Sequence, residues 1–286
     1  MTLTCGVCDG ELFETPVLGT LARCRDCGYV FLPRTPDLPR RIADLYAGDY
    51  FTGAEFGDYS AQRATFARNF QEYLRRMRQS GATRGRLLEV GCAYGFFLEQ
   101  AQGAFDARGI DVNEPAIAAA RALGVQATAG DFLTCILRDP FDVVCMWDTI
   151  EHLIEPRANL ERARDILGDR GQLFLTTGDI GSAMARLRGA QWRMIHPPSH
   201  LNYFSRATIT RLLDRVGFDV ERIGSVGTHR DLLNALHLLG LFSKKRLVKR
   251  VASTLERSLA GRGRSISFYL NLHDIMFVSA RKRAGA

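Results

Sequence analysis

The chain has 286 residues, of which 46% are hydrophobic and 24% are charged. These values are those of a soluble globular protein with room for one α/β domain and small appendages. No apolar run reaches the roughly 18 residues of a membrane span, and the N-terminus lacks a signal-peptide pattern, so a cytoplasmic protein is expected. The net charge of +7 permits a nucleic-acid partner without requiring one.

Two C-x-x-C pairs near the start of the chain are separated by 15 residues and comprise Cys5, Cys8, Cys24 and Cys27. This spacing predicts a zinc ribbon over residues 1–33, with short strands at residues 12–13 and 18–21. Four thiolates leave no coordination position for water, so the Zn²⁺ is expected to be structural rather than catalytic. A redox role needs only one such pair and is the less favoured interpretation.

Residues 34–84 are predicted to form a linker and a helical lid. Apolar side chains recur at helical spacing over residues 38–46 and again over residues 59–78. An aromatic cluster that includes Tyr46 and Tyr50 lies between these two patterns. Its side chains are expected either to pack against the main domain or to cover a bound substrate.

From residue 85 to residue 286, strand-like and helix-like patterns alternate, which predicts a doubly wound parallel sheet. The strand at residues 87–90 leads into a turn with Gly91 and Gly95, and a helical pattern follows. Glycines let the backbone approach a ligand, and the free N–H groups of a helix start point at it. Asp111 ends the next apolar run about 20 residues later, where a nucleoside ribose requires a carboxylate. The G-x-G-x-x-G spacing of a dinucleotide site is absent, which argues against NAD.

The segment Glu89-Val90-Gly91-Cys92-Ala93-Tyr94-Gly95 resembles motif I of the class I S-adenosylmethionine (SAM)-dependent methyltransferases, with Ala93 in place of the middle glycine. The resemblance implies a Rossmann-like, seven-stranded methyltransferase sheet that binds SAM at the carboxyl ends of its strands. It also implies that Asp111 binds the ribose, that Asp131 accepts the adenine amino group and that Phe132 lies against the ring. Asp131 can alternatively cap the segment that follows it. The cofactor-binding residues implied in this way are Glu89, Gly91, Ala93, Gly95, Asp111, Val112, Asp131, Phe132 and Trp147.

A second motif follows the strand at residues 142–148 and reads Asp148-Thr149-Ile150-Glu151-His152. It resembles the branch of the family that contains ubiquinone-biosynthesis, sugar and natural-product methyltransferases. In ubiquinone-branch enzymes a divalent ion is held at the positions that match Asp148, Glu151 and His152. Relatives without metal share the Glu-His pair, so a structural role or a role beside the methyl donor is favoured for His152.

The loop at residues 191–205 carries many reactive and aromatic side chains, and its two prolines exclude a regular element. His200 is the first candidate for a general base that takes a proton from an acceptor hydroxyl, and His196 is the second. The alternative is that both histidines only order the loop by hydrogen bonding. The residues expected to contact the substrate are Tyr46, Tyr50, Trp192 and Tyr203.

The C-terminal part is predicted to contain a helical insert at about residues 228–264 and a closing strand at residues 274–280. The insert includes a basic cluster at residues 244–250, for which a solvated surface is expected. Contact of this cluster with an acidic substrate, RNA or a membrane surface is the alternative. By the resemblance, the closing strand runs antiparallel to its neighbours.

These patterns favour a SAM-dependent methyltransferase that acts on a small molecule, by O-methylation of a sugar, glycolipid or secondary metabolite. An rRNA base methyltransferase is the first alternative, because one such family also joins a zinc ribbon to this fold. The N/D-P-P-Y-type motif of amino-directed base methyltransferases is absent. A non-enzymatic SAM-binding or scaffold protein is the second alternative, which Glu89, Asp111 and Asp131 disfavour. Neither the acceptor nor the oligomeric state follows from the sequence.

Overall fold

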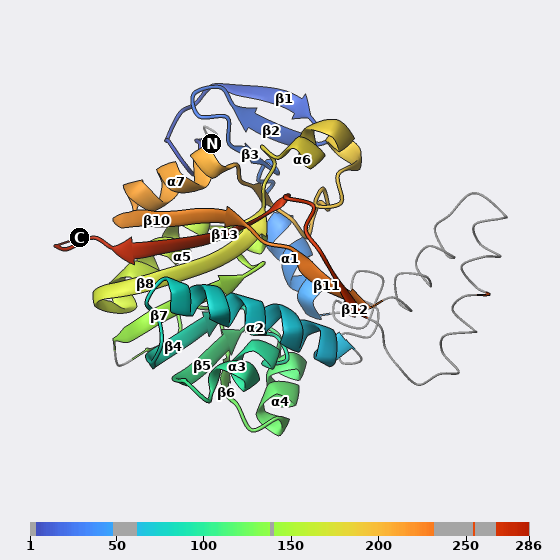
Figure 1. Ribbon diagram of the computed structural model, residues 1–286. Helices are drawn as coiled ribbons and strands as arrows, with labels where there is room; N and C mark the ends of the chain where they lie inside the picture. Colours follow the sequence, from blue (N-terminus) through green and yellow to red (C-terminus); the bar gives the residue numbers. More distant parts are fainter. Residues whose placement is uncertain (1–3, 48–61, 138–139, 232–253, 255–266, 286) are drawn as a thin grey trace.

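The computed structural model describes residues 4–47, 62–137, 140–231, 254 and 267–285. A seven-stranded sheet forms its centre, in the order β10-β13-β8-β7-β4-β5-β6 (Figure 1). Its strands are β4 (Gly85–Val90), β5 (Phe105–Asp111), β6 (Gln126–Ala129), β7 (Phe141–Trp147), β8 (Leu167–Gly178), β10 (Phe218–Ser225) and β13 (Ile275–Lys282). Neighbouring strands run parallel except at β13, which is antiparallel to both β10 and β8. The predicted doubly wound, Rossmann-like α/β sheet with an antiparallel closing strand is confirmed.

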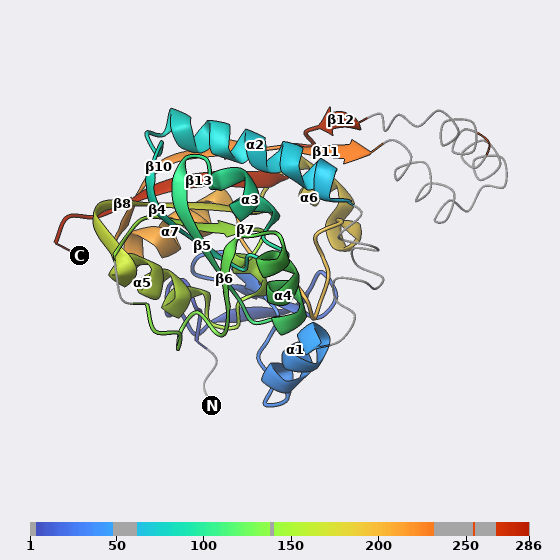
Figure 2. The same ribbon diagram turned by 90° about the horizontal axis from the view of Figure 1, so that it is seen from below.

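Helices cover both faces of this sheet, as the alternating sequence pattern predicts (Figure 1, Figure 2). On one face, α2 (Arg63–Gln79), α3 (Phe96–Ala101) and α4 (Glu114–Ala122) form an apolar core with the strands. On the other face lie α5 (Pro156–Ile166) and α7 (Arg206–Arg215). The central strands β4 and β7 are therefore almost continuously buried, which explains why their sequences are nearly unbroken apolar runs.

Local sequence signals set the starts of two helices. Asn113 caps α4 by accepting a hydrogen bond of 2.8 Å from the amide of Ala116. Ser205 caps α7 in a reciprocal arrangement with Thr208. Short helices follow the carboxyl ends of β7 and β8, and these are η2 (Ile150–His152), α6 (Ala183–Arg188) and η3 (Gly189–Gln191).

The N-terminal unit, residues 4–33, which we call the ribbon, contains β1 (Phe13–Val17), β2 (Leu21–Cys24) and β3 (Val30–Phe31). The strand expected at residues 18–21 is wrong. Leu18 and Gly19 have left-handed backbone conformations, with φ of 47° and 99°, and lie in the turn between β1 and β2.

A fourth strand, β9 (Asn202–Tyr203), completes the sheet of the ribbon in the order β1-β2-β3-β9. This strand belongs to the loop at residues 191–205, for which no regular element was expected. The two prolines end at residue 198, and Asn202 and Tyr203 have amide groups that can pair with β3. The ribbon therefore shares a sheet with the loop that carries the candidate histidines.

Helix α1 (Leu38–Ala47) follows the ribbon and packs with Leu38 and Ile42 against Leu201. The strands β11 (Thr228–Asp231) and β12 (Ser267–Leu270) pair antiparallel at the two ends of the predicted insert. Residues 228–231 of the predicted helical insert thus form a strand and not a helix. Apart from residue 254, the remainder of the insert, its basic cluster at residues 244–250 and Tyr50 lie outside the described residues. Within the described parts of the chain, no helix is both long enough and apolar enough to cross a membrane.

Candidate functional site

The turn between β4 and α3 is built so that a ligand can approach its backbone. Gly91 and Gly95 both have left-handed conformations, with φ of 76° and 73°. A Cβ atom on Gly91 would lie 2.6 Å from the hydroxyl oxygen of Thr149, and one on Gly95 would lie 2.8 Å from a methyl carbon of Val125. Glycine is therefore required at both positions. Ala93 also has a positive φ, of 44°, which costs an alanine conformational energy.

Asp111, at the carboxyl end of β5, holds this turn in place. One of its carboxylate oxygens accepts a hydrogen bond of 2.9 Å from the amide of Ala93, and the other accepts one of 2.9 Å from the amide of Asn113. Each oxygen has a second lone pair, so the carboxylate can accept two further donors, such as the hydroxyls of a ribose. Burial raises the pKa of Asp111, and the backbone hydrogen bonds oppose that rise.

Two buried polar atoms near this turn have no hydrogen-bond partner among the described residues. They are Oε2 of Glu89 and Nε1 of Trp147. Burial, and secondly the charge of Asp111, raise the pKa of Glu89 well above its ordinary value. Buried polar groups in folded proteins are nearly always paired. These two atoms lie toward the ends of two central strands and lack partners, so they fit a site where a polar ligand would supply the hydrogen bonds.

The other predicted cofactor-binding residues lie at the same edge of the sheet in different environments. Val112 is 56% exposed and offers an apolar surface next to Asp111. Asp131 accepts a hydrogen bond of 2.8 Å from the amide of Leu133 and so caps the segment after it, while its side chain stays exposed. Phe132 and Trp147 are buried in the two apolar cores. Contact of their rings with a cofactor stays a prediction.

A second group of side chains lies beyond the carboxyl end of β7. One ligand atom each of Glu151, His152 and His200 lies within 4.8 Å of the others. The rings of His152 and His200 are 4.6 Å apart and nearly perpendicular. The sequence motif groups Glu151 and His152 with Asp148, but the structure brings His200 to them instead. The carboxylate of Asp148 accepts a hydrogen bond of 2.9 Å from the hydroxyl of Thr176.

Backbone carbonyl groups orient both of these histidines. Nδ1 of His152 lies 2.9 Å from the carbonyl oxygen of Ser199, and Nδ1 of His200 lies 2.8 Å from that of Met194. Because a carbonyl oxygen only accepts, Nδ1 of each ring carries the proton. Burial lowers the pKa of His152 to about 4 and that of His200 to about 3. Both rings are therefore neutral at physiological pH, and His200 does not have the near-neutral pKa expected of the first-choice base.

Glu151 is the member of this group whose chemical role the sequence reasoning missed. Its side chain is buried, and neither of its carboxylate oxygens makes a hydrogen bond of normal distance and angle with the described residues, although the hydroxyl of Thr177 lies near enough to lower its pKa. Burial, and secondly the charge of Asp148, raise its pKa well above the ordinary value. An ionisable group with a strongly shifted pKa at the end of a strand is a candidate acid or base. The sequence signals for it were its place just after a buried strand and the Glu-His pair of the second motif, which was interpreted only as a structural or metal-binding pair.

Glu151 and His200 share a small cavity of about 10 Å³. Its lining consists of Glu151, Thr177, Gly178, Trp192, Met194, His200, Asn202 and Tyr203. Three residues predicted to contact or activate the substrate, Trp192, His200 and Tyr203, are thereby brought together. A space of this size accommodates about one water molecule. The cavity therefore has room for one hydroxyl-sized group beside Glu151.

Among the other predicted substrate and catalytic residues, Tyr46 and His196 lie close to the two histidines of this group. Tyr46 packs edge-on against His152, with ring centroids 6.4 Å apart, and its carbonyl oxygen accepts a hydrogen bond of 2.7 Å from the side chain of Asn113. Helix α1 thus connects the Asp111 side of the sheet edge to the histidine side, an arrangement that suits a lid. The ring of His196 lies 5.5 Å from that of His200. The indole N–H of Trp192 donates to the carboxylate of Asp274, so its ring is fixed in the wall.

The four cysteines of the ribbon converge as the sequence pattern predicts. Their Sγ atoms all lie within 4.8 Å of one another, with 3.6 Å between Cys5 and Cys27 and 3.5 Å between Cys8 and Cys24. Four sulfurs bound to a tetrahedral Zn²⁺ at about 2.3 Å are about 3.8 Å apart. The amide of Val7 donates a hydrogen bond of 3.4 Å to the sulfur of Cys5. The four side chains therefore fit one zinc ion.

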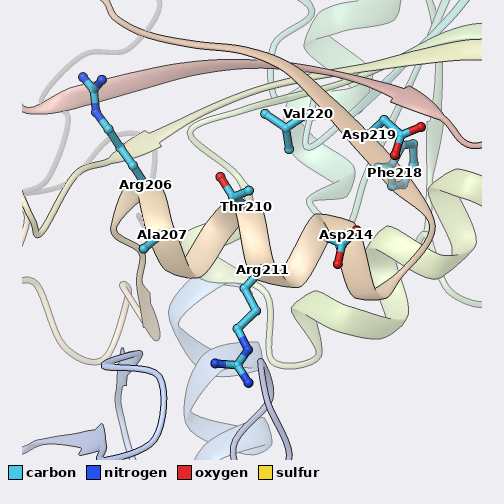
Figure 3. A pocket seen from close by; sticks show the side chains of 8 residues that line it. All are labelled: Arg206, Ala207, Thr210, Arg211, Asp214, Phe218, Asp219 and Val220. Atoms are coloured by element: carbon cyan, nitrogen blue, oxygen red, sulfur yellow. The ribbon is translucent and has the colours of Figure 1, made fainter.

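A larger surface groove, of about 630 Å³, lies along α7 and β10 (Figure 3). The carboxylates of Asp214 and Asp219 at this groove both pair with Arg283, at 2.6 Å and 2.8 Å. The side chains of Arg206 and Arg211 extend from different sides of α7 (Figure 3). Because no set of chemically active side chains converges there, the groove is not a candidate site.

Comparison with known proteins identifies a family and a fold. The sequence profile of a family described as "Methyltransferase domain" matches residues 59–223. A solved structure from Thermotoga maritima, described as a SAM-dependent methyltransferase and possible histamine N-methyltransferase, is 18% identical, with 84% of this chain and 100% of that chain covered and a TM-score of 0.52. Magnesium protoporphyrin IX methyltransferase from Synechocystis PCC 6803, with bound S-adenosylhomocysteine, is 14% identical, with 85% and 99% covered and a TM-score of 0.54. At these identities the two structures support the fold alone. A search of curated proteins found no match.

Proposed function

The chain belongs to the methyltransferase-domain family and is a SAM-dependent methyltransferase, and we propose that it methylates a hydroxyl group of a small molecule. The observation that carries this proposal is the buried carboxylate of Glu151, which makes no well-formed hydrogen bond with the described residues and lies next to His200 at a cavity with room for one oxygen atom. A sugar, a glycolipid or a secondary metabolite offers such a hydroxyl. Because the chain belongs to an enzyme family, the alternative of a non-enzymatic scaffold protein is no longer favoured.

The donor side of the site is proposed to be the turn at Gly91 and Gly95. Asp111 would accept hydrogen bonds from the ribose hydroxyls, and Val112 and Asp131 would lie near the adenine. Unpaired polar atoms of Glu89 and Trp147 support a polar ligand here. When bound, SAM supplies a methyl group that is attached to a positively charged sulfur. An acceptor that lies in line with the carbon–sulfur bond can take this methyl group, and the sulfur is the leaving group.

On the acceptor side, Glu151 is proposed to receive the proton that the acceptor hydroxyl loses as its oxygen attacks the methyl group. The raised pKa of Glu151 makes it a stronger base than an exposed glutamate. His200 donates its Nδ1 proton to a carbonyl oxygen, so Nε2 carries a lone pair and can orient the acceptor hydroxyl. His196 is proposed to order the loop beside His200 and not to transfer a proton.

Two other chemistries use the same residues and are separable by experiment. The carboxylate and two imidazoles of Glu151, His152 and His200 form a ligand set that a divalent cation can occupy. An rRNA base remains the alternative acceptor, although the basic cluster that favours it lies outside the described residues.

The proposed acceptor class can be tested with SAM that carries an isotopic label on its methyl group. The enzyme is incubated with this donor and either a small-metabolite fraction or purified rRNA. We expect the label in the small-metabolite fraction, attached to an oxygen atom as identified by mass spectrometry. Labelled RNA with no labelled metabolite would instead support the rRNA alternative, because the water-sized cavity would then not be the acceptor site.

We also propose that Cys5, Cys8, Cys24 and Cys27 hold one structural Zn²⁺. Their sulfur atoms have the spacing of a tetrahedral site, and all four ligands come from the protein, which leaves no position for a reacting water. The ribbon spans only residues 4–33 and has short strands, so metal binding is expected to supply much of its folding energy.

Elemental analysis of freshly purified, reduced protein is expected to give one zinc per chain. Replacement of Cys24 by serine removes one ligand, and we expect that variant to lose most of its zinc, because an incomplete thiolate set binds more weakly. Replacement of Cys145, a buried cysteine of β7 outside the ribbon, by alanine is the matched control and should retain the metal. Wild-type protein without zinc would exclude the proposed site.

A further inference from the structure

The buried side chain of Asn202 joins the ribbon to the segment that carries Glu151. Asn202 is 6% exposed. The two N–H donors of its Nδ2 group face the carbonyl oxygens of Leu153, at 2.7 Å, and of Ile150 and Glu151, which share one donor at 3.2 Å and 3.3 Å. Its Oδ1 atom accepts a hydrogen bond from the hydroxyl of Tyr29. The N–H groups of this amide therefore bind the Glu151 segment, and its oxygen binds Tyr29 of the ribbon. If the amide were flipped, neither set of hydrogen bonds could form.

Tyr29 is fixed in turn by the second pair of cysteines. Its carbonyl oxygen accepts a hydrogen bond of 2.9 Å from the amide of Cys24, and the amide of Gly28 donates one of 2.9 Å to the carbonyl oxygen of Cys24. The ring of Tyr29 stacks on Phe31 and on Phe204, with centroids 5.3 Å and 5.4 Å apart. A metal that binds Cys24 and Cys27 would close the turn between them. It would thereby fix the position of Tyr29, whose hydroxyl group donates a hydrogen bond to Asn202.

Backbone hydrogen bonds connect the same segments. The amide of Leu32 donates to the carbonyl oxygen of Leu201, and the amide of Leu201 donates to the carbonyl oxygen of Glu151, both at 2.8 Å. Strand β3 pairs with β9, so that Phe31 lies opposite Asn202. The segment from Leu201 to Tyr203 is thus held between the ribbon on one side and the Glu151 segment on the other.

We propose that Asn202 is a positioning residue through which the metal-bound ribbon holds Glu151, His152 and His200 in their observed arrangement. The inference rests on the proposed function, since it takes these three residues as the acceptor side of the site. It follows that loss of the metal from the ribbon disorganises the acceptor side. The SAM side is built on β4 and β5, whose strand pairing does not involve Asn202, and it is expected to keep its structure.

Histidine NMR at one neutral pH tests this inference without knowledge of the acceptor. The ring signals of His152 and His200 are assigned by His→Gln variants in the zinc-loaded protein. In the wild type, the Nδ1 proton of each ring should be observable and protected from exchange, because it is held by the carbonyl oxygen of Ser199 or of Met194. In the Asn202→Asp variant a carboxylate faces three carbonyl groups, and both Nδ1 proton signals should be lost or shifted.

Two further samples keep the test decisive if Asn202→Asp does not fold. Tyr29→Phe removes only the hydroxyl group, and chelator-treated wild type lacks the metal; both should show the same loss or shift. The matched control is Arg157→Ala, because Arg157 ties the ribbon to α5 through Gly6 and Asp9, without Asn202; its Nδ1 proton signals should equal those of the wild type.

Calorimetry on the same samples should give unchanged SAM affinity. Nδ1 proton signals that stay unchanged in the folded variants and in the metal-free protein would overturn the positioning role. Absence of SAM binding in the wild type would instead count against the proposed function, and the histidine signals would still report on the network.

Discussion

Replacement of Glu151 by glutamine is expected to slow methyl transfer by roughly 10²- to 10⁴-fold, the usual contribution of a positioned general base. Glutamine has nearly the same shape but cannot accept the proton of the acceptor hydroxyl. The measurement is the initial rate of label transfer to the methylated metabolite at saturating SAM. SAM affinity, measured by calorimetry, should not change, because Glu151 is not among the residues that hold the donor.

The matched control for this substitution is Glu155→Gln. Glu155 lies four residues further along, is about half exposed and pairs with Arg34 at the surface. Its replacement should leave the rate of methyl transfer unchanged. Equal rates for wild type and Glu151→Gln would exclude Glu151 as the proton acceptor.

The pH dependence of the rate gives a second readout for Glu151. Its pKa is raised by burial, so the rate should fall on acidification at a higher pH than an ordinary glutamate would produce. The rate falls as the pH is lowered because a protonated Glu151 cannot accept the hydroxyl proton. Because the pKa of His200 is about 3, a His200→Gln variant should be slower but keep this acid limb. Loss of the limb in His200→Gln would return the role of the base to His200.

Replacement of Asp111 by alanine is expected to weaken SAM binding roughly 10- to 150-fold, which corresponds to the loss of hydrogen bonds to a charged group worth about 1.5–3 kcal/mol. The variant loses the acceptor for the ribose hydroxyls and leaves the amides of Ala93 and Asn113 without their partner. Calorimetric titration with SAM or S-adenosylhomocysteine measures the effect.

Asp106→Ala is the matched control, because Asp106 lies near the opposite end of the same strand, β5, where it pairs with Arg108. Its replacement should leave SAM affinity unchanged. Since burial raises the pKa of Asp111, wild-type affinity should also fall on acidification earlier than an ordinary aspartate would predict, as the protonated carboxyl loses acceptor capacity. Unchanged SAM affinity in Asp111→Ala would place the donor elsewhere.

The central sheet could be predicted from the sequence because its signals are local. The apolar run before Gly91, the cap at Asn113 and the capping box at Ser205 each lie within a few residues of the element that they define. The two glycines of the first turn were identified from spacing alone, and the structure supplies the reason: a side chain on Gly91 or Gly95 would collide with a neighbouring element.

The acceptor side could be predicted only in part. The density of aromatic and histidine residues in the loop pointed to Trp192, His200 and Tyr203, which do line one cavity. The pairing of residue 31 with residue 202 depends on tertiary structure, because no periodicity links segments so far apart in the chain. The burial that shifts the pKa of Glu151 upward and that of His200 downward arises in the same way, so their roles could not be read from residue type.

A crystal structure of the protein with S-adenosylhomocysteine is the measurement that tests most directly whether one continuous site joins the two halves. We predict that the ribose hydroxyls bind Asp111 and that the sulfur atom faces the cavity formed by Glu151 and His200. A methyl group on that sulfur would then point at an acceptor oxygen beside the carboxylate. A nucleoside bound away from Asp111, or a sulfur atom directed away from Glu151, would contradict the proposed site.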